Sequence, residues 1–147
     1  MNIIRRILSL CLCAMLLLGS AIAESPAVDI DLTGLNSNMV YAEVFSMLTE
    51  PKAYEGKIIK MKGTFTSVED LTIDFSFYAL LIADAAACCQ QGFEFVRDDK
   101  GLYPETYPQE GEETTIIGRY ETYQDDGETY VRLRVMSPDD MFYASKQ

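Results

Sequence analysis

The spacing of apolar and polar residues changes its period along the chain. Between residues 39 and 50, apolar side chains recur every three or four positions, the period of a helix with one buried face. Asn36, Ser37 and Asn38 precede this stretch as candidate caps, and Pro51 cannot continue it. The pattern predicts one amphipathic helix, over residues 39–50.

Most of the remaining chain shows the two-residue period of β-strands. Residues 58–65 place apolar side chains and Gly63 on one face and lysines on the other, and a strongly bent strand needs such a glycine. Asp126-Gly127 is typical of a tight hairpin turn between two alternating runs. The five predicted strands are residues 58–65, 75–83, 92–97, 114–123 and 128–136.

Five short strands with a closing hairpin fit a small coiled barrel better than a flat sandwich. We expect a mainly β fold, a five-stranded OB-like, partly closed barrel with one N-terminal helix. Residues 24–37 contain the breakers Pro26 and Gly34 and are predicted to be an irregular lead-in. The single barrel domain is then 38–147, with a tail or short closing turn after Pro138.

Residues 1–23 have the organisation of a signal peptide. Two arginines precede an apolar run of 12 residues, 7–18, and a small-x-small sequence ends at Ala23. The run is shorter than the roughly 20 residues that span a membrane. Lipidation at Cys11 or Cys13 is the competing interpretation, and we favour cleavage over it because each cysteine follows a leucine rather than a small residue. We expect a secreted or extracytoplasmic protein without stable membrane insertion after cleavage.

Charge restricts the partners of the mature chain. The signal holds two of the 12 basic residues and none of the 23 acidic ones, so the remaining 124 residues carry a formal charge of −13. This excess opposes binding to phosphate backbones and anionic lipids, and no nucleic-acid partner is expected. We favour a simpler meaning of the same excess, which is that it keeps an exported protein soluble.

The composition excludes several kinds of enzyme. The chain has no histidine, which removes Ser-His and Cys-His dyads, histidine-ligated zinc and imidazole proton shuttles. It has no glycine-rich phosphate loop of either standard form. With 23 carboxylates, pairs suited to acid-base chemistry arise by chance. We predict a non-enzymatic protein without a resident cofactor.

Cys88 and Cys89 are the two cysteines that remain after cleavage, and they are adjacent. Adjacent thiols act as soft-metal ligands, as a redox couple, or as small apolar side chains in a tight corner. A disulfide between them is strained, because neighbouring Cα atoms are about 3.8 Å apart and a relaxed disulfide needs about 4.4 Å or more.

Further metal ligands would have to come from a carboxylate such as Asp84 or Glu94, from water or from a second chain, whereas Cu(I) needs only two sulfurs. We predict that the corner is mainly structural, with partly sheltered thiols. The alternative is Cu or Zn binding, or redox chemistry, at Cys88, Cys89 and Asp84.

The chain also has 16 aromatic residues. Barrels of the OB type bind oligonucleotides and sugars by stacking on exposed rings, and Tyr78, Phe93 and Tyr120 are the candidates for ligand binding. We favour the competing interpretation that most of the aromatic side chains fill the interior.

Several short motifs resemble those of exported OB-fold-like proteins of unknown function from Gram-positive bacteria. They are Pro51-x-x-Tyr54-x-Gly56-Lys57, Lys60-Met61-Lys62-Gly63, Asp84, Cys88-Cys89, Gly92 and Gln109-Glu110-Gly111. The chain is more distantly similar to the C-terminal domain of a permease-partner protein, in which an Asp-Ala pair follows the two cysteines rather than preceding them. The resemblance covers roughly residues 39–136 and implies a fold, since neither family brings a settled activity.

The function predicted from the sequence is an extracytoplasmic, non-enzymatic binding or interaction module for an unidentified protein or small-molecule ligand. The alternative is a soft-metal-binding or thiol-redox protein that acts through Cys88-Cys89.

Overall fold

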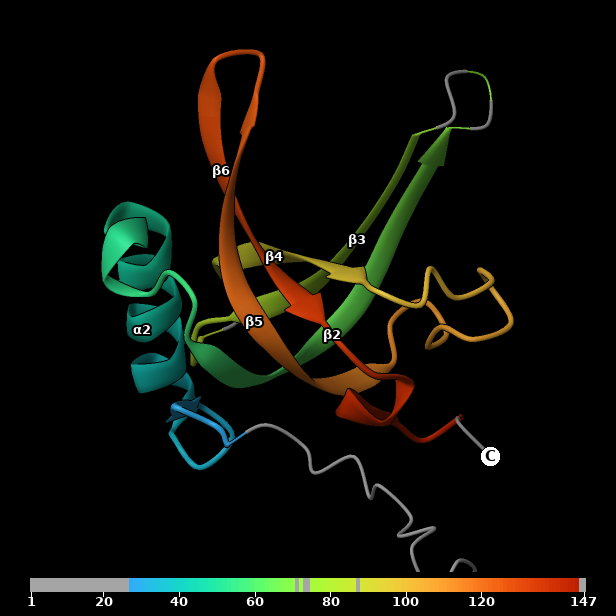
Figure 1. The fold of residues 1–147 in the computed structure, drawn as a ribbon. Coiled ribbons are helices and arrows are strands. Elements are labelled where there is room, and N and C mark those ends of the chain that lie inside the picture. The colour runs from blue at the N-terminus through green and yellow to red at the C-terminus, as the bar shows by residue number, and fades with distance from the viewer. Residues whose placement is uncertain (1–26, 71, 73–74, 87, 146–147) are drawn as a thin grey trace, which may run out of the picture.

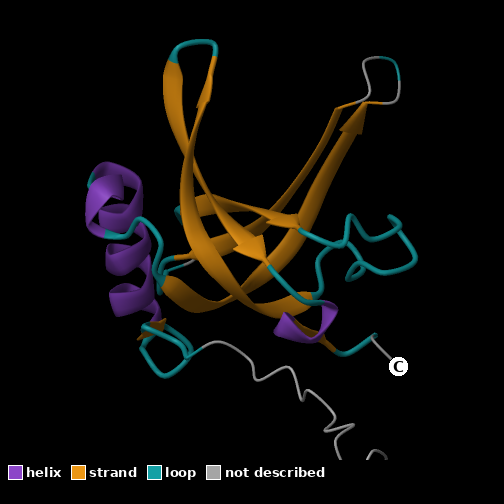
Figure 2. Ribbon diagram, viewed as in Figure 1, coloured by secondary structure: helices purple, strands orange, loops and turns teal. Residues whose placement is uncertain are grey.

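The computed structural model describes residues 27–145 except 71, 73, 74 and 87, so the predicted signal peptide lies outside the described residues. Within them, seven strands form one mixed sheet that curls into a partly closed ring, and one α-helix packs beside it (Figure 1, Figure 2). The mainly β fold with an N-terminal helix is therefore confirmed.

The helix α2 spans Ser37–Thr49 and the short 3-10 helices are η1 (Pro51–Ala53) and η2 (Pro138–Asp140). The strands are β1 (Ile30–Asp31), β2 (Ile58–Asp70), β3 (Phe75–Ala83), β4 (Gln90–Arg97), β5 (Glu113–Asp125), β6 (Glu128–Val135) and β7 (Met141–Tyr143). The five predicted strands correspond to β2 through β6. The predicted number was wrong, because β1 and β7 are too short to show a period and form only by pairing with β2 and β5.

Strand β2 closes the ring by pairing on both of its edges. Its first half, from Ile58 to Thr64, pairs with β5, and its second half, from Thr64 onward, pairs with β3. The remaining neighbours are β3 with β4, β4 with β6 in parallel, and β6 with β5. At the switch, a Cβ on Gly63 would lie 2.9 Å from the Leu81 carbonyl oxygen, so the predicted need for a glycine is confirmed.

Helix α2 is fixed to the ring at its C-terminal end. The Asn36 side chain accepts a hydrogen bond from the Met39 amide (3.1 Å) and begins the helix, and Pro51 follows its end. The buried Tyr120 hydroxyl donates to the Met47 carbonyl (2.5 Å), which the helix leaves without an internal partner. None of the helices in the described part of the chain is long and apolar enough to cross a bilayer.

The core fills the ring and the space between the ring and α2. Its fully buried side chains come from the helix, from the ring strands, from Met141 of β7 and from Leu32, which lies in the segment predicted to be irregular. Leu32 enters the core because the Leu32 amide donates to the Lys60 carbonyl and continues the β1–β2 pairing.

Two hairpins extend from the same side of the closed part of the ring, and their tips point away from each other (Figure 1). We call residues 66–78 the β2–β3 arm and residues 121–132 the β5–β6 arm. The tip of the second is a tight turn in which Asp126 and Gly127 both have positive φ, 46° and 83°, as the sequence predicts.

Candidate functional site

The β3–β4 turn gathers the predicted metal or redox residues around one carboxylate. Asp84 Oδ1 accepts the Cys88 amide (3.0 Å) and the Cys89 amide (3.5 Å). Asp84 Oδ2 accepts the Cys88 thiol at 3.2 Å, and the two Sγ atoms are 3.8 Å apart. One donor atom from each of the three residues lies within 4.8 Å of the others, so the structure brings all three together.

Both thiols are free and exposed, so the prediction of partly sheltered cysteines was wrong. The physical reason is that the corner is an exposed turn, in which Ala85, Ala86 and Gln90 are exposed as well and the cysteines form their hydrogen bonds with Asp84. The hydrogen bond to Asp84 raises the pKa of the Cys88 thiol. The same bond lowers the pKa of the Asp84 carboxyl.

The two arms form a second candidate site, which the sequence analysis missed. Exposed acidic side chains stand on both arms: Glu69 and Asp70 on the first, and Asp125, Asp126 and Glu128 on the second. The chain has no Lys or Arg between Lys62 and Arg97, or between Arg119 and Arg132. These two unbalanced stretches are the sequence signal that indicates an acidic face.

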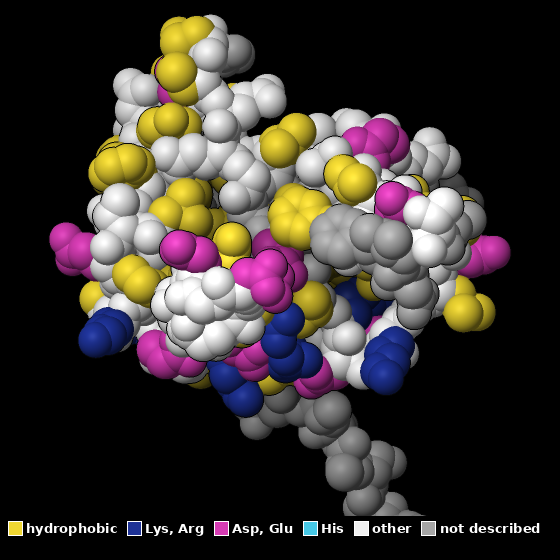
Figure 3. Space-filling model, turned by 90° about the horizontal axis from the view of Figure 1, so that it is seen from above, with side chains coloured by type: hydrophobic (Ala, Val, Ile, Leu, Met, Phe, Trp, Pro, Cys, Tyr) yellow, Lys and Arg dark blue, Asp and Glu magenta, His cyan; other side chains and the backbone are white. Residues whose placement is uncertain are grey.

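A recess of about 220 Å³ joins the two arms. Phe77 of the β2–β3 arm and Tyr130 and Val131 of the β5–β6 arm line it, together with Leu48 of α2 and Glu94 of β4. Tyr130 is 46% exposed and Leu48 39%, so the recess presents apolar surface to solvent. Seen from above, hydrophobic side chains surround the hollow between the arms and acidic side chains stand at its edge (Figure 3).

Glu94 of β4 lines this recess and is bonded to the second arm. Its Oε2 accepts the Tyr123 hydroxyl at 2.5 Å, and the Arg132 guanidinium lies 4.6 Å from the centre of the Tyr123 ring. Burial raises the pKa of Glu94. Glu94 also lines a neighbouring recess of about 240 Å³ with Tyr78 and Lys100, so two hollows meet at this carboxylate.

The three aromatic residues predicted to bind a ligand do not form an exposed surface. Phe93 and Tyr120 are 1% and 0% exposed inside the ring, and neither offers a ring face to a ligand. Tyr78 is half-buried and packs against Tyr107, with ring centres 4.4 Å apart. Among the three, only Tyr78 reaches a recess.

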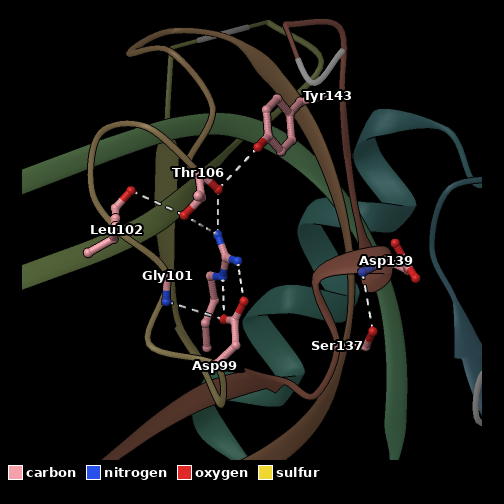
Figure 4. A network of polar contacts seen from close by, with 8 residues as sticks. Asp99, Gly101, Leu102, Thr106, Ser137, Asp139 and Tyr143 are labelled. Carbon is pink, nitrogen blue, oxygen red and sulfur yellow. Dashed lines mark hydrogen bonds and ion pairs between the residues drawn. The ribbon is translucent and has the colours of Figure 1, made fainter.

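The buried Arg97 organises the connection between β4 and β5 (Figure 4). Its guanidinium pairs with Asp99 through two hydrogen bonds (2.6 and 2.9 Å) and donates to the carbonyl and hydroxyl of Thr106. The guanidinium carbon lies 4.9 Å from the centre of the Tyr107 ring, and the side chain is 4% exposed. Arg97 therefore acts as an anchor for residues 98–107.

Comparison with models of known protein families and with curated proteins finds no match. The assignment of function rests on the two exposed features described above, the cysteine corner and the recess between the arms.

Proposed function

We propose that the protein is an extracytoplasmic, non-enzymatic binding module with an OB-like barrel, and that it binds a basic, partly apolar peptide segment between its two arms. The barrel assignment is supported by the five-strand ring β2–β3–β4–β6–β5, which closes on β2 with a parallel β4–β6 pair. Export is supported by the signal-like residues 1–23.

The observation that carries the proposal is the partly apolar recess between two arms whose exposed charged side chains, among the described residues, are all acidic. The one base on the arms, Arg132, is half-buried and pairs with Glu121. Apolar walls provide contact area, and acidic rims attract a cationic partner and reject an anionic one. Glu94 adds a half-buried carboxylate to the lining of the recess, where a partner's ammonium group would replace lost hydration.

The proposal is tested by titrating residues 24–147 with a short peptide of alternating lysine and leucine and with its glutamate-leucine counterpart. We expect calorimetric binding of the first peptide alone, weakening as salt rises. The triple variant Glu69→Gln, Asp125→Asn, Glu128→Gln removes three arm charges, and we expect affinity to fall about tenfold.

The matched control removes three exposed charges away from the arms, by Glu105→Gln, Glu113→Gln and Asp139→Asn. Equal losses in the two triple variants would show that the peptide responds to net charge alone, and the arm proposal would be wrong. Export is checked separately by the intact mass of the secreted chain, which we expect to begin at Glu24.

A further inference from the structure

The β3–β4 turn places two neighbouring thiols on the same side of the chain. In an extended chain, successive side chains point in opposite directions. Here Asp84 pulls the amides of Cys88 and Cys89 toward one oxygen, and the two Sγ atoms come to 3.8 Å. The backbone of the turn therefore orients the thiols before any ligand arrives.

These spacings match those of a tetrahedral ion with sulfur ligands. Two Zn–S bonds of about 2.3 Å at the tetrahedral angle separate the sulfurs by about 3.8 Å. A Zn–O bond of about 2.1 Å places sulfur and oxygen about 3.6 Å apart. The Sγ atoms are already at the first distance, and Asp84 Oδ2 is 3.2 Å from Cys88 Sγ, a few tenths short of the second.

We propose that Cys88, Cys89 and Asp84 bind one thiophilic divalent ion, with Zn(II) as its type, and leave the fourth coordination position to solvent or to a donor from another molecule. The site is independent of the peptide proposal, because none of its three residues lines the recess between the arms. Exposure of both thiols keeps the ion accessible for exchange.

The ligand chemistry restricts the choice of ion. Two sulfurs and one carboxylate oxygen favour Zn(II) and exclude Mg(II) and Ca(II), which require oxygen ligands. Binding replaces two S–H bonds by two metal–sulfur bonds, and both protons pass to the buffer. The Asp84 carboxylate is already ionised and releases none.

The test is an anaerobic titration of reduced residues 24–147 with Zn(II) in competition with a chromophoric chelator. We expect one ion per chain, two protons released per ion, and an X-ray absorption spectrum with two sulfurs and lighter donors around zinc. Cys88→Ser and Cys89→Ser should each weaken binding by about 100-fold or more, beyond the effect of losing an outer-sphere partner.

Asp84→Asn separates the ligand role from the turn role, because the amide oxygen still accepts the backbone hydrogen bonds. We expect it to weaken binding about tenfold. The matched control is Asp70→Asn, since Asp70 accepts the amide (2.9 Å) and hydroxyl of Thr72 in the β2–β3 turn, where no cysteine is present. Asp70→Asn should leave zinc affinity unchanged.

Unchanged zinc affinity in the Cys88→Ser, Cys89→Ser double variant would overturn the proposal. So would binding of Cu(I) alone by two sulfurs with no effect of Asp84→Asn, because the three-ligand site would then not exist.

Discussion

The closed base of the ring and the two arms share the strands β2, β3, β5 and β6, yet the side chains of the two regions have different tasks. At the base, β2 pairs with β5 while Phe93, Tyr120 and Met47 pack inward with almost no exposed surface. In the arms, the same strands continue without a second neighbour and present acids and partly exposed apolar groups. One part of each shared strand therefore stabilises the fold, and the other part of the same strand presents the surface for recognition.

The largest expected difference between base and arms comes from removing one aromatic ring in each. Phe93→Ala leaves a cavity in the core and should lower the free energy of unfolding by about 3–5 kcal/mol. Tyr130→Ala removes a ring that is already 46% exposed and should cost less than about 1 kcal/mol. Urea denaturation measures both, and similar losses would contradict the division between base and arms.

A smaller effect is expected at the point where β2 changes partners. Gly63→Ala forces a Cβ against the backbone of Leu81 and the Cβ of Leu80, and we expect a loss of about 1–3 kcal/mol. Gly34→Ala is the control, because a Cβ there meets no atom within 4 Å. If the two substitutions cost the same, the ring does not close as tightly as the distances indicate.

Removing the charge of Glu94 and removing that of Glu121 are expected to change the stability at pH 7 in opposite directions. Burial raises the pKa of Glu94 above its ordinary value near 4.5, so the folded state holds the proton more tightly and the ionised group opposes folding. The folded protein therefore gains stability from protonation of Glu94 as pH falls through the pKa that Glu94 has in the folded state. Glu94→Gln keeps an acceptor for Tyr123 and should stabilise the protein at pH 7 by less than about 1 kcal/mol, with the gain shrinking toward pH 4.

Glu121 provides the opposite case. Hydrogen bonds from Arg134 lower its pKa, so its contribution is present at neutral pH and is lost as pH falls through the folded value. Glu121→Gln should therefore destabilise at pH 7 and less so in acid. Equal signs for the two variants in urea titrations at several pH values would contradict the burial of Glu94.

The smallest effect on stability is expected at the cysteine corner. Cys88→Ala with Cys89→Ala removes two exposed side chains while Asp84 keeps its backbone hydrogen bonds. Thermal unfolding of this double variant should be indistinguishable from that of the unaltered chain. A clear loss would restore the structural role that the sequence predicts for the pair.

The local pattern of apolar and polar residues predicts most of the helices and strands, but it does not predict which side chains are exposed. The period of the apolar residues locates α2 within two residues at its start, and the run 75–83 coincides with β3, because both depend on neighbours in sequence. Strands β1 and β7 depend on distant partners, and no period shows in two or three residues.

The candidate sites divide in the same way. That Asp84, Cys88 and Cys89 meet follows from their closeness in sequence, but the side on which the thiols lie is decided by the turn. For Phe93 and Tyr120, the alternation of apolar and polar residues predicts that one face of each strand is buried. Closure of the ring determines that both side chains point into its interior. Glu94 meets Tyr123 across 29 positions, a contact that no local pattern indicates.

Amide-resolved NMR of labelled residues 24–147, titrated first with Zn(II) and then with the lysine-leucine peptide, tests the separation of tasks most directly. The account predicts that zinc shifts amides of residues 84–90, that the peptide shifts amides of the two arms, and that the paired residues 58–64 and 113–119 respond to neither. Shifts concentrated in the base of the ring, or the same set of amides responding to both additions, would contradict it.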